Sequence, residues 1–244
     1  MKTLFSIGDS HTFGAEILGA GKLYDEENKK FAFPNKLRGL LEYDKVDNWG
    51  ISGASIMYVE RGLVDYLSTN PKPDLVTIGW TCLGRMEVCD GFDDNGDYQY
   101  SLHSSWENPE WDRQNRDRYK QLLPQLLSED LLAQKYRTHI RCSALLDSLR
   151  IPHIFFDVME NTRKEAPISG VGDDGVNKLW DGNHPLDKKL YEYINKNNYI
   201  ENTTYWDYCQ YKPNVEWNGG HYNEWAHTHW AHYLKKQLNK RRII

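Results

Sequence analysis

The chain has 244 residues, of which 39% are hydrophobic and 27% are charged, and its formal net charge is −5. This composition is typical of a globular protein long enough to bury a core, and it excludes the basic surface that nucleic-acid binding requires. No stretch is apolar enough to span a membrane and the first residues lack the pattern of a signal peptide, so we expect a cytoplasmic protein.

Predicted strands and helices alternate along the chain. In order, the patterns predict a strand at 3–8, a helix at 34–42, a strand at 45–49, a helix at 56–69, a strand at 74–79, a helix at 129–149, a strand at 151–158 and a helix at 223–240. Alternation of this kind is typical of a parallel sheet that carries helices on both faces. We therefore expect an α/β fold with a parallel sheet of about five strands.

Two long segments interrupt this alternation. Residues 86–128 are acidic, aromatic and irregular, and residues 160–220 are rich in Asn, Gly and Tyr. We interpret the chain as a single domain, residues 1–244, in which these two segments are insertions that build one side of a cleft. Their many Trp and Tyr side chains suit a surface that stacks on sugars, or else a small aromatic core within the loops.

Polar and glycine-rich motifs follow the predicted strands. Gly8-Asp9-Ser10 follows the first strand, NWGISGAS (48–55) the second and GWTCLGR (79–85) the third, whereas NGGHYNEWAH (218–227) precedes the last helix. Ligands and catalytic groups gather where the carboxyl ends of parallel strands meet. Ser10 is therefore a candidate nucleophile, although such a serine also serves as a helix cap, and Asp9 is a turn acid that holds the same loop.

These four motifs, in this order, resemble those of the SGNH (GDSL-type) hydrolases, a superfamily of esterases, lipases and carbohydrate deacetylases. The resemblance implies a flavodoxin-like three-layer α/β/α sandwich. It also implies that Ser10 is the catalytic nucleophile and that His221 is the general base. The backbone N–H groups of Ser10 and Gly53 would belong to the oxyanion hole, although Gly53 is equally well explained as a turn residue.

Two positions depart from the family pattern. Thr81 stands where the family has an oxyanion-hole asparagine, and Asn218 stands where it has the aspartate that orients the histidine. A threonine hydroxyl can donate one hydrogen bond, and Arg85 could supply a charged donor instead. Asn218 can orient His221 but cannot stabilise an imidazolium by charge. Another carboxylate, such as Asp207, or a Ser–His dyad is therefore an alternative.

A second histidine competes with His221. In DGNHP (181–185), Asp181 and His184 have the spacing of the family's aspartate and histidine, and a proline after the histidine is also typical of the family. We prefer His221 because it precedes the final helix, as the catalytic histidine does in the family.

The sequence predicts neither a metal site nor a cofactor. The four cysteines include no CxxC pair, which argues against a disulfide framework and against zinc. His229 and His232 recur on the last helix without an adjacent Asp or Cys, so we interpret them as solvated or packed side chains.

We interpret the chain as a serine esterase that removes a small acyl group, an acetyl group in the first place, from a carbohydrate or a similar ester. Its partner is then a small-molecule or glycan ester. Two other functions fit the same motifs. One is a binding protein or virion-associated structural protein that keeps the hydrolase fold without catalysis, and the other is an acyltransferase that uses a hydroxyl acceptor in place of water.

Overall fold

Five parallel strands form the central sheet of the protein. The computed structural model describes residues 1–93, 98–104, 125, 130–159 and 184–244. Within these residues the strands lie in the order β2-β1-β3-β6-β7. Their bounds are β1 Thr3–Gly8, β2 Lys45–Gly50, β3 Leu75–Trp80, β6 His153–Asp157 and β7 Tyr199–Ile200. This is the 2-1-3-4-5 order of flavodoxin-like folds, and it confirms the predicted parallel sheet of about five strands.

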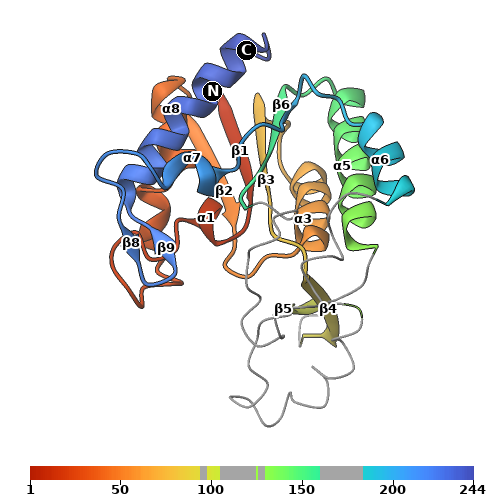
Figure 1. Cartoon of the computed structure of the whole chain (residues 1–244), viewed down its shortest axis with the longest axis horizontal. Coiled ribbons are helices and arrows are strands. Elements are labelled where there is room, and N and C mark those ends of the chain that lie inside the picture. The colour runs from red at the N-terminus through yellow and green to blue at the C-terminus, as the bar shows by residue number, and fades with distance from the viewer. Residues whose placement is uncertain (94–97, 105–124, 126–129, 160–183) are drawn as a thin grey trace.

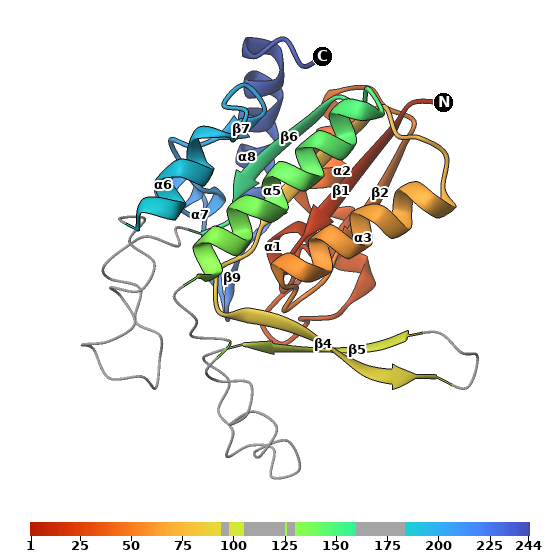
Figure 2. The ribbon, with the colours of Figure 1, turned by 90° about the vertical axis from the view of Figure 1, so that its right-hand side faces the viewer.

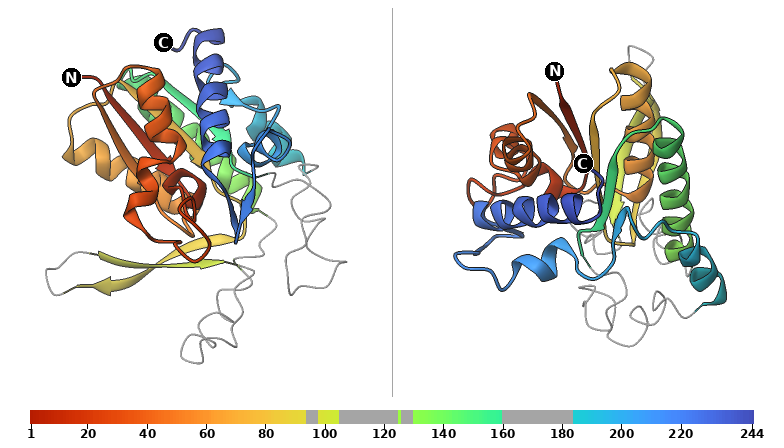
Figure 3. Two further views of the ribbon diagram at one scale, coloured as in Figure 1. Left: turned by 90° about the vertical axis from the view of Figure 1, so that its left-hand side faces the viewer. Right: turned by 90° about the horizontal axis from the view of Figure 1, so that it is seen from above.

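Helices cover both faces of the sheet, which gives three layers (Figure 1). On one face, α2 (Phe33–Leu40) packs against α8 (Glu224–Lys240). On the other, α3 (Ile56–Thr69) packs against α5 (Leu131–Ser148), with α6 (Pro185–Glu192) beside α5. The view from above in Figure 3 shows the two groups of helices on opposite sides of the strands. Among the described helices, none combines the length and the apolar character needed to cross a membrane.

Burial of the central strand β3 between the two helical layers stabilises the sheet. All six of its residues are buried, as expected for a continuous apolar run in a parallel strand that is covered on both faces. Phe5 and Ile7 of β1 join the core beneath α3 and α5, whereas Leu4 points to the opposite core, beneath α2 and α8. This alternation of side chains lets one strand supply both layers.

The eight predicted helices and strands are all present, and their ends agree with the prediction to within two residues. The sequence analysis missed β7, because a strand of two residues is too short to show a periodic pattern. β7 lies inside the segment 160–220, so this segment is not wholly an insertion: it supplies the fifth strand of the sheet and the short helix α7 (Tyr205–Cys209).

An antiparallel hairpin extends from the carboxyl edge of the sheet (Figure 2). It consists of β4 (Arg85–Phe92) and β5 (Tyr98–Ser104), which pair with a register shift between Cys89 and Gly91. The hairpin lies in the segment 86–128, which we expected to be irregular.

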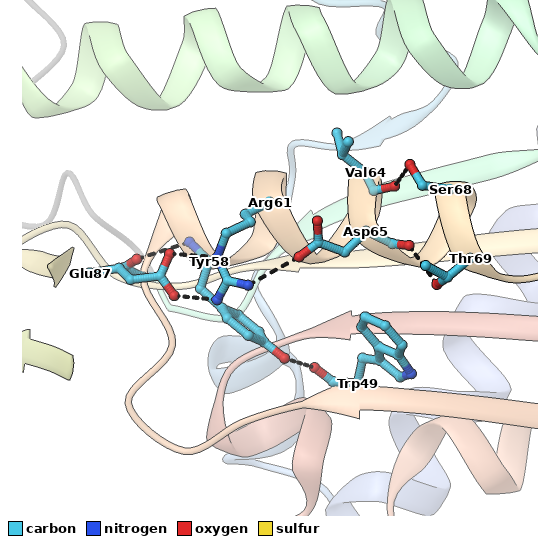
Figure 4. A network of polar contacts seen from close by, with 9 residues as sticks. Trp49, Tyr58, Arg61, Val64, Asp65, Ser68, Thr69 and Glu87 are labelled. Atoms are coloured by element: carbon cyan, nitrogen blue, oxygen red, sulfur yellow. Dashed lines mark hydrogen bonds and ion pairs between the residues drawn. The ribbon is translucent and has the colours of Figure 1, made fainter. Parts of the chain in front are cut away.

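Arg61 of α3 fastens this hairpin to the body of the protein (Figure 4). Its Nη2 and Nε donate to the two carboxylate oxygens of Glu87 in β4, at 2.6 and 3.1 Å, and its Nη1 donates to Asp65 at 3.1 Å. The guanidinium carbon also lies 4.0 Å from the centre of the Tyr100 ring in β5. The Glu87 side chain is only 4% exposed, so the bidentate ion pair is what makes its burial tolerable.

We expect Arg61→Met to destabilise the fold, because it leaves the Glu87 carboxylate buried without its cation. Loss of one partner of a fully buried pair costs about 3–5 kcal/mol, and since the Arg61 side chain is 32% exposed we expect about 2 kcal/mol here. Urea unfolding should show this decrease. The double variant Arg61→Met/Glu87→Met should recover most of it, and a double variant as unstable as the single one would contradict our account of the ion pair.

Candidate active site

Ser10 lies on a tight turn at the carboxyl end of β1, where it begins the four-residue helix α1 (Ser10–Phe13). Asp9 is the N-cap of this helix, and its Oδ1 accepts a hydrogen bond from the N–H of His11 at 3.0 Å. Gly14 ends the helix in the left-handed conformation, with φ of 89°. The Ser10 residue is only 3% exposed, so the turn holds its hydroxyl within the structure.

Glycines allow α1 to lie against the ends of two strands. A Cβ atom on Gly50, at the end of β2, would be 2.3 Å from the backbone nitrogen of Phe13. A Cβ atom on Gly8 would be 2.3 Å from Thr12 Oγ1 and 2.9 Å from the carbonyl oxygen of Gly79. Real side chains do not approach so closely, so the Ser10 turn can lie in this position only if residues 8 and 50 are glycine.

Asp9, Thr81 and Arg85 form a connected polar group beneath the Ser10 turn. Arg85 Nη1 donates to Thr81 Oγ1 at 2.7 Å and lies 3.3 Å from Asp9 Oδ2. Asp9 and Thr81 are completely buried. Burial raises the pKa of the Asp9 carboxyl, while the positive charge of Arg85 and the hydrogen bonds from His11 N–H and the Thr81 hydroxyl act in the opposite direction.

His221 comes from the far end of the chain and meets the segment that follows Ser10. It begins β9 (His221–Tyr222), which forms a small hairpin with β8 (Trp217–Asn218). Its Nδ1 lies 2.8 Å from Oε2 of Glu16, and both side chains are nearly buried, with 13% and 11% exposed. The His221 ring also lies beside the ring of His11, with 4.9 Å between the ring centres.

Three donors surround the carboxylate of Glu16. Besides His221, the N–H of Gly220 donates to Oε2 at 2.8 Å and the N–H of Gly21 donates to Oε1 at 3.0 Å. Burial alone would raise the pKa of Glu16, but the hydrogen bonds from His221, Gly21 and Gly220 and the charge of His221 outweigh it and lower the pKa. Glu16 is therefore a carboxylate, held where it can orient the imidazole and stabilise its charged form.

The turn of the β8–β9 hairpin is shaped to receive this carboxylate. Gly219 has φ of 61°, in the left-handed region, and a Cβ atom there would lie 2.6 Å from Glu16 Oε1. The two glycines of the NGGH motif thus have separate functions. Gly219 leaves room for the carboxylate, and Gly220 donates a hydrogen bond to it.

Two further histidines, His11 and His227, are buried near His221. Burial lowers the pKa of His227 to about 3, and burial together with the charge of His221 lowers the pKa of His11 well below its ordinary value. His227 Nδ1 accepts a hydrogen bond from the N–H of Phe33 at 3.2 Å. Both rings are thus neutral and serve as packed, uncharged neighbours of His221. Within the described part of the chain, no group of three or more His, Cys, Asp or Glu side chains is arranged to hold a metal ion.

The acidic partner of His221 was not found by the sequence analysis. We expected Asn218 to orient His221, with another carboxylate or a Ser–His dyad as alternatives. The structure brings the carboxylate of Glu16 to Nδ1, because Asn218 lies opposite His221 in the hairpin while Glu16 enters from the loop after α1. Asp207, the alternative acid, instead forms part of the N-terminal turn of α7, where its N–H and its Oδ2 both hydrogen-bond to Thr204 Oγ1 at 3.0 Å. Neither residue is therefore the carboxylate that meets the imidazole.

The competing histidine, His184, lies in a different place. It is the N-cap of α6, and its Nδ1 accepts the N–H of Leu186 at 3.2 Å. α6 packs against α5, on the opposite face of the sheet from α8, whose N-terminus follows His221. Asp181, its predicted partner, lies outside the described residues.

The two proposed backbone donors are available. Among the hydrogen bonds of the described residues, none uses the N–H of Ser10 or that of Gly53. Gly53 has φ of 85°, in the left-handed region that favours glycine, as expected of a turn residue. The loop that carries Gly53 is tied to the Ser10 turn, since the N–H of Ile51 donates to the carbonyl oxygen of Gly8 at 3.1 Å.

No protein-family model and no curated protein sequence matches this chain. Several solved structures are similar to it. The psychrotrophic esterase EstA from Pseudoalteromonas sp. matches with a TM-score of 0.52 and 13% identity, over 98% of this chain and 100% of that one. The acetyl xylan esterase Est2A from the rumen bacterium Butyrivibrio proteoclasticus matches with a TM-score of 0.51 and 12% identity, over 100% of this chain and 65% of that one.

A lipolytic protein of the G-D-S-L family from Desulfitobacterium hafniense is also similar, with a TM-score of 0.44 and 15% identity, over 98% of this chain and 100% of that one. The similarity to EstA and Est2A extends over nearly the whole chain. The chain therefore has an α/β fold with a five-stranded parallel sheet flanked by helices, which is consistent with the SGNH fold that the motifs predicted. At such low identity the comparison establishes the fold, and the roles of individual residues depend on the geometry described above.

We expect Gly219→Ala to destabilise the protein by about 1–2 kcal/mol, because alanine is strained in the left-handed region and its Cβ would collide with the Glu16 carboxylate. Gly220→Ala is the matched control. Its Cβ would lie 3.4 Å from Glu16 Oε2, an ordinary contact, so its effect on the free energy of unfolding in urea should remain within about 0.5 kcal/mol. Equal effects of the two substitutions would show that the hairpin turn does not depend on Glu16.

Proposed function

We propose that the protein is a serine esterase in which Ser10, His221 and Glu16 act as a catalytic triad. The observation that carries the proposal is the 2.8 Å contact between His221 Nδ1 and the Glu16 carboxylate. With Nδ1 held by Glu16, Nε2 is the nitrogen that remains for the hydroxyl of Ser10. His11, the next residue after Ser10, is already in contact with the His221 ring.

The reaction begins when His221 accepts the proton of the Ser10 hydroxyl, and Ser10 Oγ attacks the carbonyl carbon of the ester. The C=O π electrons move to the oxygen, which becomes the oxyanion of a tetrahedral intermediate. The intermediate collapses, the alcohol leaves with the proton from His221, and the acyl group remains on Ser10. A water molecule then gives a proton to His221 and attacks the acyl carbon, the bond from that carbon to Ser10 Oγ breaks, and His221 returns the proton to Ser10 as the carboxylic acid leaves.

The imidazolium that forms in each step needs a negative partner. Glu16 supplies it, since hydrogen bonds from two backbone N–H groups keep its carboxylate ionised and in place. The family's aspartate is absent at position 218, and we propose that Glu16 replaces it from the opposite end of the chain.

For the oxyanion we propose the N–H groups of Ser10 and Gly53, which have no acceptor among the described residues. Thr81 and Arg85 are bound to each other, and Arg85 also approaches Asp9. We therefore assign Thr81 and Arg85 to fixing the Ser10 turn rather than to binding the oxyanion. This assignment explains why an asparagine is not required at position 81.

We propose a small acyl ester on a carbohydrate, an O-acetyl group in the first place, as the substrate. Exposed aromatic surface lies next to His221: Trp217, 47% exposed, packs on Trp206 and on Tyr222, with 4.6 and 5.0 Å between ring centres. The exposed indole of Trp217, held in place by these edge-on contacts, suits the apolar face of a sugar ring. Est2A, which has a similar fold, is an acetyl xylan esterase, and this supports the same class of substrate.

The direct test is hydrolysis of p-nitrophenyl acetate by the wild-type protein and by Ser10→Ala. We expect saturable release of p-nitrophenol by the wild type and only the background rate in Ser10→Ala. Ser68→Ala, which removes an exposed hydroxyl on α3, is the matched control and should retain the wild-type rate. If turnover is absent or does not depend on Ser10, the protein is not a serine esterase of this type, and the fold serves binding alone.

Glu16→Gln should lower kcat roughly a hundredfold to ten-thousandfold, because a carboxamide is nearly the same size but cannot stabilise the imidazolium by charge. Asn218→Ala tests the assignment made from the sequence, and we expect it to change kcat less than about threefold. Circular dichroism of both variants checks that they are folded. A larger decrease in kcat for Asn218→Ala than for Glu16→Gln would show that Asn218, and not Glu16, orients His221.

A further inference from the structure

A pocket lies at the same edge of the sheet as Ser10. Its volume is about 170 Å³, and it is bounded by β6, β7, α5 and α6. Residues at the carboxyl ends of two strands line it, Asp157 from β6 and Ile200 from β7, together with the segment that leads into α7. Glu201, one of the lining residues, is exposed, so the pocket reaches the surface.

A buried ammonium group forms part of the pocket wall. Lys135 of α5 is only 2% exposed, and its Nζ lies 2.7 Å from Asp157 Oδ1. The other oxygen of Asp157 accepts a hydrogen bond from the hydroxyl of Tyr199 at 2.6 Å. A lysine ammonium has three N–H donors, and Asp157 is the one ion-pair partner of Lys135 within the described residues. The remaining donors of a charge so deeply buried require oxygen acceptors, which water or a ligand in the pocket can supply.

The charges of the pocket are already balanced by the protein. Asp157 is paired with Lys135, and Glu201 lies 3.6 Å from Lys196. The hydroxyl of Tyr191 also donates to Glu201 at 2.5 Å. The charge of a charged ligand would therefore have no counter-charge in the pocket. A neutral ligand with several hydroxyl groups can both accept a hydrogen bond from Lys135 and donate one to Glu201.

Aromatic rings form another part of the wall. The rings of Tyr136 and Tyr191 lie 5.5 Å apart and contribute apolar surface beside the charged groups. A pocket that combines aromatic surface with paired donors and acceptors suits a ring whose edge carries hydroxyl groups and whose face is apolar.

The pocket adjoins the candidate active site through α7. Thr204 lines the pocket and caps this helix, the next residue Tyr205 packs on the ring of His11, and Trp206 packs on Trp217. The N-terminus of α7 thus borders the pocket, while its side chains Tyr205 and Trp206 contact His11 and Trp217 of the candidate active site. A glycan of several units could occupy both places.

We propose that this pocket binds a neutral sugar unit and so serves as a secondary subsite for the glycan whose ester is hydrolysed. The proposal rests on the proposed function for its choice of ligand. Binding needs no turnover, however, so the two can fail separately.

The test is isothermal titration of the wild-type protein with two unacetylated probes, xylotetraose and cellotetraose. We expect saturable binding of at least one probe. Glu201→Gln and Tyr136→Ala, which removes the ring, should weaken it about tenfold, and Lys135→Met should abolish it. Glu192→Gln, an exposed position on α6 outside the pocket, is the matched control for Glu201→Gln and should bind like the wild type. Hydrolysis of p-nitrophenyl acetate should be unchanged in Glu201→Gln and Tyr136→Ala.

Since Lys135 is buried, Lys135→Met is informative only if circular dichroism shows that it is folded. The substitutions at Glu201 and Tyr136 decide the question without it. The proposal is wrong if neither probe binds, or if Glu201→Gln and Tyr136→Ala bind as tightly as Glu192→Gln. It is equally wrong if glucuronate or inorganic phosphate competes with the bound sugar, because an anion would then be the ligand. Loss of p-nitrophenyl acetate hydrolysis in Ser10→Ala leaves the sugar-binding result unaffected.

Discussion

The contact between Glu16 and His221 joins two parts of the chain that are 205 residues apart. It is possible because β1 lies near the middle of the sheet, so the loop after β1 and the hairpin before α8 emerge at the same edge. Two backbone N–H groups, one from each partner segment, donate to the same carboxylate. The contact between Glu16 and His221 therefore fixes the imidazole and also fastens the β8–β9 hairpin to the loop after Ser10, and the proposed chemistry depends on this contact.

The fold could be predicted because its main elements carry strong local patterns. β3 is a continuous apolar run, and α3 and α8 have apolar residues at helical spacing, so burial on both faces of a sheet follows directly. β7 carries no such pattern. It has two residues, Tyr199 and Ile200, and it is a strand only because β6 offers it an open edge. Elements that exist through pairing with a neighbour, like this strand, are not encoded in their own sequence.

The site could be predicted only where short motifs specify backbone geometry. Gly8-Asp9-Ser10 requires a capped turn after a strand, and NGGH requires a turn with φ above zero, and both are present. Glu16 has no such signal. Its apolar neighbours Ala15 and Ile17 distinguish it from Glu26, which lies among charged residues, but they do not show that it meets His221, since that is a tertiary contact. The family pattern directed attention to position 218, but in this chain the carboxylate that contacts the imidazole comes from Glu16, in the loop after α1.

Buried charges are concentrated at the carboxyl edge of this sheet. Asp9 and Glu16 lie after β1, and Lys135 meets Asp157 at the end of β6. A buried ion pair is a weak source of stability, because desolvation of both groups offsets most of their attraction. Apolar residues of similar size would hold these elements together as well or better. We therefore explain the charges by what they can bind at this edge: around Ser10 they would hold the proposed nucleophile and base in place, and around Asp157 the buried Lys135 lines an open pocket.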